Sequence, residues 1–145
     1  MLEPSAMGFR SFIHKLTAPR PKRSLSINEE VKMVFVINSE LKMGKGKIAA
    51  QVGHAAVSST LKSGEKTPDL LEFWLATGQK KICVKGSDAE HLLQLEKYCK
   101  EIGITTVKIH DAGHTQIPKG SLTVLSLGPD TESNLNKISG ELKLL

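Results

Sequence analysis

Residues 33–56, MVFVINSELKMGKGKIAAQVGHAA, contain the pattern that decides the fold. The run 33–37 is continuously apolar and rich in β-branched side chains, which predicts a strand buried on both faces. A turn rich in lysine and glycine follows, and a helical pattern begins at Gly46. Such a helix start offers unpaired backbone N–H groups, the positive end of a helix dipole and mobile cations. The stretch therefore predicts a strand–turn–helix unit that binds a polyanion.

Strand and helix patterns alternate along the rest of the chain. We expect helices over residues 46–63, 69–76, 88–102 and 132–142, and further strands over residues 81–85, 104–109 and 121–127. Local signals mark the helix ends: Pro68 begins a helix, Ser87 caps one, and Gly64, Gly78 and Gly103 follow the ends of three. In the helix over 88–102, one apolar face consists of Leu92, Leu95, Cys99 and Ile102.

This alternation is typical of the α/β class. Three strands separated by helices predict a mainly parallel sheet with right-handed crossovers. Only a loop joins the last two strands, so we expect the fourth strand to run antiparallel and the sheet to be mixed. The fold predicted for residues 32–145 is a single compact α/β domain. It has a four-stranded, mostly parallel mixed sheet with helices on both faces.

Composition narrows the classes of function. The chain of 145 residues has a net charge of +5 but only 4% aromatic residues, so base stacking on an aromatic platform is not favoured. Acidic residues are absent between Glu40 and Glu65, whereas four lysines lie there. Cys83 and Cys99 have no metal-type spacing and are expected to be reduced thiols in the core. No apolar run is long enough to span a membrane.

Residues 1–31 differ from the remainder of the chain. They contain three prolines, scattered serines and five basic against three acidic residues, and residues 8–16 (GFRSFIHKL) could form a short basic amphipathic helix. A mitochondrial presequence is one interpretation, although Glu3 counts against it, and a disordered leader or an added extension is the other. The expected location is therefore cytoplasmic, or mitochondrial if this segment is a presequence.

The carboxyl ends of parallel strands are where sites gather in such folds. Residues 38–47 follow the first strand, and residues 111–121 (DAGHTQIPKGS) follow the third, so both loops should emerge at one edge of the sheet. A carboxylate beside a hydroxyl, as at Asp111 and Thr115, can hold and polarise a water. The alternative is an Asx-type turn in which Asp111 only caps its own loop.

Helical spacing supplies a partner for that loop. Lys47, Gln51, His54 and Ser58 share one face of the first helix, beside an apolar face formed by Ile48, Val52, Ala55 and Ala56. A solvated polar face is the alternative to a functional one, and His54 alone would more often be structural. Because the stripe starts at the lysine–glycine turn, we favour a functional edge.

Two other chemistries fit less well. His110, Asp111 and His114 are close in sequence, but adjacent residues of an extended chain point in opposite directions and a fourth metal ligand is not evident. A nucleotide-binding P-loop is excluded because Lys47 is followed by Ile48, and Leu41 stands where the first glycine is required. We expect no metal and no organic cofactor.

Taken together, these segments resemble the archaeal and eukaryotic (type II) peptidyl-tRNA hydrolases. The resemblance covers residues 32–145 and rests on KMVFVI, ELKMGKGKIAAQVGHAA, QKK before the second strand, DAGHTQI, and the closing SLTVLSLGP and LKLL. It implies a compact α/β fold and cofactor-independent hydrolysis of the ester that joins a peptide to the terminal ribose of tRNA.

The resemblance also implies roles for particular residues. Those implied for the active site are Lys47, Asp111 and Thr115, with His54 and Gln51 as nearby candidates. We expect contact with tRNA from Lys42, Lys45, Gln51, His114 and Gln116. Asn38 stands where the family commonly has arginine, and His114 where it often has arginine or lysine.

The predicted substrate is peptidyl-tRNA, attacked by water that Asp111 orients or deprotonates while Lys47 stabilises the oxyanion. Because no serine or cysteine stands in a recognisable nucleophile motif, direct attack by water is preferred to an acyl-enzyme. The alternative function is a non-catalytic module that binds tRNA or a protein in cell-death or ubiquitin-linked signalling. The sequence leaves both a monomer and a homodimer open.

Overall fold

The sheet predicted from the strand patterns is present in the computed structural model, which describes residues 27–113 and 117–145. In chain order the elements are β1 (Val31–Asn38), the 3-10 helix η1 (Ser39–Leu41), α2 (Lys45–Lys66), α3 (Pro68–Ala76), β2 (Lys81–Gly86), α4 (Ala89–Ile102), β3 (Thr106–His110), β4 (Leu122–Thr131) and α5 (Glu132–Ser139). The α/β class is confirmed. None of the helices in the described part of the chain is long and apolar enough to cross a membrane.

The four strands form one mixed sheet in the order β2-β1-β4-β3. β1 and β2 are parallel, whereas β4 runs antiparallel to both of its neighbours, β1 and β3. Three strands therefore point the same way, but β4 lies between β1 and β3, so only one hydrogen-bonded pair is parallel. As expected, the carboxyl ends of β1 and β3 lie at the same end of the sheet, which brings the segments that follow these strands together.

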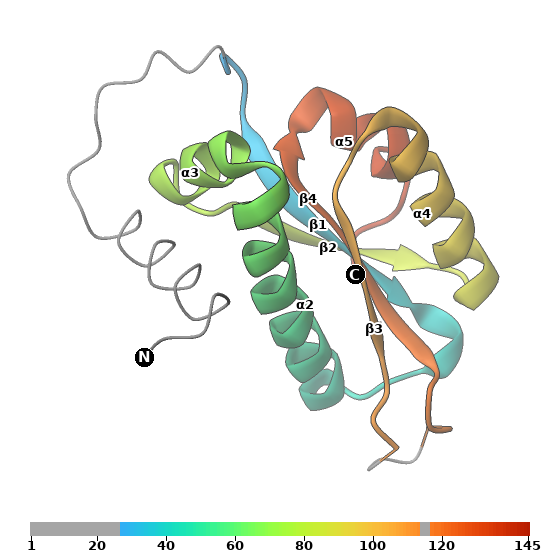
Figure 1. Ribbon diagram of the computed structural model, residues 1–145. Coiled ribbons are helices and arrows are strands. Elements are labelled where there is room, and N and C mark those ends of the chain that lie inside the picture. The colour runs from blue at the N-terminus through green and yellow to red at the C-terminus, as the bar shows by residue number, and fades with distance from the viewer. Residues whose placement is uncertain (1–26, 114–116) are drawn as a thin grey trace, which may run out of the picture.

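Helices cover both faces of the sheet, with α2 and α3 on one side and α4 and α5 on the other (Figure 1). The two faces of β1 show this directly, because all eight of its residues are buried. Met33, Phe35 and Ile37 pack in the cluster that contains residues of α2 and α3, whereas Val34 and Val36 pack in the cluster that contains residues of α4 and α5. The strand buried on both faces is confirmed.

Four local predictions are wrong. Asp88, not Ser87, caps α4, because its carboxylate accepts the His91 N–H at 2.8 Å. Ile102 is 43% exposed rather than part of the apolar face, since it lies in the last turn of α4. Gly64 does not end the first helix, which continues to Lys66. The last helix ends at Ser139, three residues before the expected Leu142.

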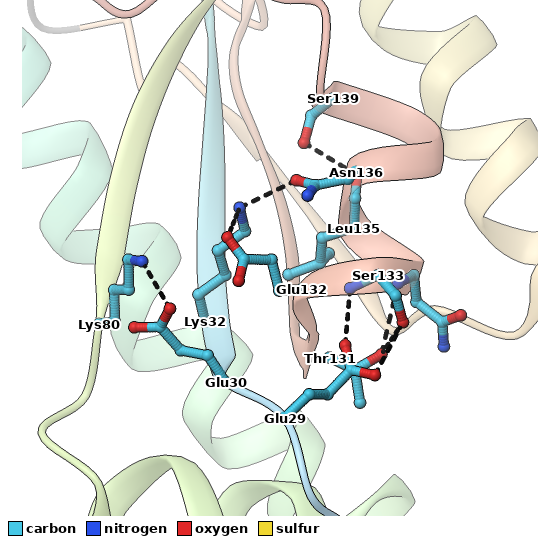
Figure 2. Close-up of polar contacts among 11 residues, drawn as sticks. Glu29, Glu30, Lys32, Lys80, Thr131, Glu132, Ser133, Leu135, Asn136 and Ser139 are labelled. Atoms are coloured by element: carbon cyan, nitrogen blue, oxygen red, sulfur yellow. Dashed lines mark hydrogen bonds and ion pairs between the residues drawn. The ribbon is translucent and has the colours of Figure 1, made fainter.

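The described residues before β1 are fastened to the C-terminal half of the domain, as Figure 2 shows. Both carboxylate oxygens of Glu29 accept hydrogen bonds from Ser133, one from its backbone N–H at 2.8 Å and one from its hydroxyl at 3.0 Å. These bonds, the backbone one foremost, hold the pKa of Glu29 below its ordinary value. The buried Lys32 donates to Asn136 at 3.0 Å, so β1 and α5 are joined by polar contacts as well as by packing.

Candidate active site

Two of the residues predicted to carry chemistry, Lys47 and Asp111, meet where α2 begins and β3 ends. Lys47 lies in the first turn of α2, and Asp111 directly follows β3. The Lys47 ammonium and the Oδ1 atom of Asp111 form a hydrogen-bonded ion pair, although the residues are 64 positions apart in sequence. The side chain of Asp111 is 1% exposed and that of Lys47 is 21% exposed, so the pair joins a buried carboxylate to a partly solvated cation.

The backbone around Asp111 fixes the position of its carboxylate. Its N–H donates to the Ser121 carbonyl and its own carbonyl accepts from Gly120 N–H, each at 2.9 Å, which ties the two ends of the loop together. Its Oδ2 atom accepts the Gly113 N–H at 2.9 Å. The Asx-type turn and the functional interpretation are therefore compatible, because the carboxylate caps its loop with one oxygen and pairs with Lys47 through the other.

A cleft of about 400 Å³ lies beside this pair. Among the described residues, its walls come from α2, from the end of β3 and from the two residues that follow β3. The lining residues are Lys47, Ala50, Gln51, His54, Lys108, Ile109, His110, Asp111 and Ala112. The residues that line the cleft are therefore an aspartate, two lysines, a glutamine and two histidines, together with the apolar residues Ala50, Ile109 and Ala112. Groups of this kind can orient a water and stabilise an oxyanion.

The polar stripe of α2 forms one wall of the cleft. Lys47, Gln51 and His54 all line it, which places them together as the helical spacing predicts, whereas Ser58 does not. Gln51 is buried and His54 is exposed. Lys62 extends the same stripe, and its ammonium donates to the Thr106 carbonyl at 2.7 Å.

The start of α2 has the features of an anion site. Gly44 occupies the N-cap position and makes no side-chain hydrogen bond to the helix, so it leaves backbone N–H groups of the first turn without a side-chain cap. A Cβ atom built on Gly44 or Gly46 would meet no atom within 4 Å, which shows that the turn is open. Lys42 and Lys45 are exposed and do not line the cleft, so their cations are available to a ligand outside it.

Sequence reasoning missed part of the cleft. Ala50, Lys108, Ile109 and Ala112 line it but were not proposed, and His110 was considered only as a metal ligand. Ala50 lies one turn from Lys47 and His54, so helical spacing could have found it. No local signal distinguishes Lys108, whose ammonium instead lies 3.3 Å from the Glu96 carboxylate on α4.

Three predicted site residues, His114, Thr115 and Gln116, lie outside the described residues. Their roles stay predictions, and the disfavoured alternative of a metal held by His110, Asp111 and His114 is likewise untested, because His114 is among them. Within residues 27–113 and 117–145, no group of three or more His, Cys, Asp or Glu side chains could hold a metal ion. Asn38 is buried at the end of β1, where its amide donates to the Leu122 carbonyl at 2.8 Å and joins β1 to β4.

Both cysteines are free thiols, as expected, and neither lines the cleft; Cys99 is buried in the core, whereas Cys83 is only partly buried. Burial raises the pKa of Cys99 to about 12, with a smaller contribution from the carboxylates of Asp130 and Glu96. Burial also raises the pKa of Cys83. Both thiols are therefore protonated at neutral pH and are poor nucleophiles.

The fold and the site together define an α/β protein with an acid–base pair in a cleft beside a cationic helix start. Residues 31–145 match the family model described as Peptidyl-tRNA hydrolase PTH2. The chain belongs to this family.

Curated relatives agree with the family model. The proteins named peptidyl-tRNA hydrolase 2, mitochondrial, from Bos taurus and Homo sapiens are 47% and 46% identical over 115 residues, which is 79% of this chain and 64% of theirs. The peptidyl-tRNA hydrolase of Methanothermobacter thermautotrophicus is 44% identical over 115 residues and is covered completely. The match thus spans somewhat less than two thirds of the mammalian relatives but the whole of the archaeal one.

Proposed function

We propose that this protein hydrolyses the ester between a peptide and the 3′-terminal ribose of tRNA, and so recycles the tRNA. The observation that carries the proposal is the Lys47–Asp111 pair in the cleft between α2 and β3. Membership of the peptidyl-tRNA hydrolase family supports it, as do relatives that bear this activity in their names.

The reaction that we propose uses water as the nucleophile. Asp111 accepts a hydrogen bond from the water, orients it and takes its proton as the water oxygen bonds to the ester carbonyl carbon. A carboxylate has about four lone-pair positions, so the bonds from Lys47 and Gly113 do not by themselves prevent Asp111 from accepting one from the water. Lys47 stabilises the negative charge that develops on the carbonyl oxygen.

The collapse of the tetrahedral intermediate completes the balance. The bond between the acyl carbon and the ribose oxygen breaks, and the ribose oxygen takes up a proton. The new carboxyl group of the peptide and Asp111 each release a proton to solvent, so the peptide leaves as a carboxylate and Asp111 returns to its ionised form. We assign delivery of the ribose proton to His54, which lines the cleft and is exposed to solvent that can reprotonate it. The roles of His54 and Lys47 can be exchanged within this scheme, and no metal or organic cofactor is used in it. Thr115, as a helper of Asp111, stays a sequence-based proposal.

The tRNA portion would bind at the open start of α2. Lys42 and Lys45 offer exposed cations, and the exposed Gly46 lies beside them in the first turn of the helix, which has no side-chain cap. Phosphates are favoured at such a helix start by the dipole and by direct hydrogen bonds. We assign the acceptor-stem backbone to this surface, with Gln51, His114 and Gln116 nearer to the terminal nucleotide.

The test is release of free tRNA from N-acetyl-aminoacyl-tRNA by the purified protein, with unblocked aminoacyl-tRNA as the matched control substrate. The proposal expects release from the blocked substrate and much slower release from the unblocked one. If the protein binds the blocked substrate but releases no tRNA, it is instead a non-catalytic binding module on this fold.

The compartment and the domain boundaries are part of the same proposal. Residues 32–145 would form the hydrolase domain, and residues 1–31 a leader whose nature decides between cytoplasm and mitochondrion. The bovine and human relatives are named mitochondrial, which supports testing a targeting role. Residues 1–31 fused to a fluorescent protein should accumulate in mitochondria if they are a presequence and stay in the cytoplasm if they are not.

A further inference from the structure

The two edge strands of the sheet differ in whether their outward-facing backbone groups are paired. β2 forms one edge and β3 the other. The outer side of β2 is covered by the C-terminal residues, because Lys85 N–H donates to the Lys143 carbonyl at 2.8 Å and Leu145 N–H donates to the Cys83 carbonyl at 3.0 Å. No backbone group within residues 27–113 and 117–145 pairs with the outer side of β3. An unpaired strand edge is a template on which another extended chain can pair.

The register of β3 shows which backbone groups face outward. Gly128 N–H donates to the Thr105 carbonyl at 2.8 Å, and the Ile109 carbonyl accepts the Thr123 hydroxyl at 3.0 Å, so the backbone N–H and C=O groups of the odd-numbered residues point toward β4. In an antiparallel pair the backbone groups of every second residue point away from the partner strand. Lys108 and His110 therefore present their N–H and C=O groups to the outside of the sheet.

The open edge forms the second wall of the cleft. The polar stripe of α2 runs alongside β3 and contacts it at both ends, through Lys47 to Asp111 and through Lys62 to the Thr106 carbonyl. Figure 1 shows α2 and β3 next to each other along this length. Because Lys108 and His110 line the cleft, the unpaired edge leads directly to the Lys47–Asp111 pair.

We propose that the peptide of a peptidyl-tRNA binds in this cleft as an added strand along the outer edge of β3, parallel to it. This inference rests on the proposed hydrolase function. The direction follows from the chemistry, because the ester carbonyl is the C-terminal end of the peptide and must lie at Asp111, where β3 ends. The preceding residues of the peptide then extend back toward Thr106.

In this arrangement the protein recognises the peptide through hydrogen bonds to its backbone and not through its side chains. The Lys108 carbonyl accepts a peptide N–H, and the N–H groups of Lys108 and His110 donate to peptide carbonyls. An unblocked aminoacyl-tRNA has a charged ammonium in place of the amide and no preceding carbonyl. It therefore has no peptide carbonyl that could accept from the N–H groups of Lys108 and His110. The Thr106 carbonyl already accepts a hydrogen bond from Lys62, so we expect Lys108 and His110, the outward-facing residues nearest Asp111, to contribute most to recognition of the last two or so residues of the peptide.

The first test uses the wild-type protein and a series of tripeptidyl-tRNAs. Each substrate carries a single N-methyl group, placed at a different amide of the peptide. Methylation of the amide that donates to the Lys108 carbonyl should lower kcat/KM by roughly three- to tenfold, as expected for loss of one hydrogen bond. Methylation of the neighbouring amide, which points away from the strand, should leave kcat/KM close to that of the unmethylated substrate. Equal effects at both amides, or none at either, would overturn the inference while hydrolysis of the unmethylated substrate upholds the proposed function.

The second test changes the protein and compares Lys108→Pro with Lys108→Ala. Both variants lose the ammonium near Glu96, but only proline removes the outward N–H, and proline is tolerated at a sheet edge. We expect kcat/KM for tripeptidyl-tRNA to be roughly three- to tenfold lower in Lys108→Pro than in Lys108→Ala, mainly through KM.

Equal values in two folded variants would refute the added strand. Circular dichroism and thermal unfolding establish whether each variant folds, and the N-methyl series on wild type decides the question if Lys108→Pro does not. If wild type hydrolyses none of these substrates, the proposed function fails and this inference fails with it.

Discussion

Replacement of Asp111 by asparagine separates the chemistry of the cleft from its architecture. The two side chains have nearly the same shape, so the amide oxygen can keep the hydrogen bond from Gly113 N–H. The amide NH₂ group then faces the Lys47 ammonium, and two hydrogen-bond donors meet where an ion pair stood. The variant therefore loses both the base and the partner of Lys47 without creating a cavity.

The cost in stability follows from the burial of the pair. Removing one partner of a fully buried ion pair costs about 3–5 kcal/mol, whereas an exposed pair contributes about 0.2–1 kcal/mol. With Asp111 at 1% and Lys47 at 21% exposure, the lysine can turn its ammonium to solvent, so we place the loss at about 1–3 kcal/mol. Adding Lys47→Met to Asp111→Asn should recover part of this loss, because the unpaired cation is removed.

The effect on turnover should be much larger than that on stability. Loss of a positioned general base lowers the chemical step by about 10²- to 10⁴-fold. The assay is single-turnover release of tRNA from N-acetyl-aminoacyl-tRNA with protein in excess, and affinity for an uncleavable amide-linked analogue is measured in parallel. We expect the rate to collapse while this affinity stays nearly unchanged.

A matched control distinguishes the cleft from charge in general. Glu101→Gln removes an exposed carboxylate on α4, outside the cleft, and should keep the wild-type rate. A rate for Asp111→Asn within about threefold of wild type, in a folded protein, would refute the role of Asp111. Equal losses of rate and affinity would instead show that Asp111 serves substrate binding.

Other predictions concern the tRNA surface, the N-terminal attachment, a helix cap and the thiols. Lys42→Ala should weaken tRNA binding at low salt and reduce the slope of log K against log salt by about one unit, which titrations at several salt concentrations measure. Glu29→Gln should lower the free energy of unfolding at neutral pH, because a lowered pKa stabilises the fold above the ordinary value of 4.5; the difference from wild type should disappear as pH falls through the lowered pKa, as acid-range denaturant titrations would show. Asp88→Ala should cost about 1 kcal/mol through loss of the α4 cap, again by denaturant titration, with Ser87→Ala close to neutral as its control. Cys99 should resist alkylation at neutral pH in the native protein and react once the protein is unfolded, as mass spectrometry would detect.

Much of the fold can be predicted from the sequence, because apolar residues recur with the periods of strands and helices. The apolar run in β1 predicts a strand buried on both faces, and both faces are packed. Strand order cannot be predicted in this way, because no local pattern indicates that β4 lies between β1 and β3. Gly64 illustrates a limit of turn signals, since a glycine within a helix costs only about 1 kcal/mol and α2 is still packed at the neighbouring buried Ser63.

The site could be predicted to a similar degree. Lys47 and Asp111 meet because a helix start and a strand end at one sheet edge are fixed by topology, which the alternation of elements predicts. Lys108 was missed because its contribution depends on β3 being an edge strand, a property of strand order that its own sequence does not encode.

The most direct test of the central claim is the structure of the protein with an uncleavable mimic of the substrate end, an N-acetyl-aminoacyl group joined by an amide to 3′-amino-3′-deoxyadenosine. The account predicts that the acyl carbonyl oxygen lies within about 3 Å of the Lys47 ammonium, with a water between the carbonyl carbon and Asp111. The ribose should lie toward the start of α2, and the acetyl group should lie along β3. A mimic seated elsewhere, with the cleft between α2 and β3 empty, would contradict the account.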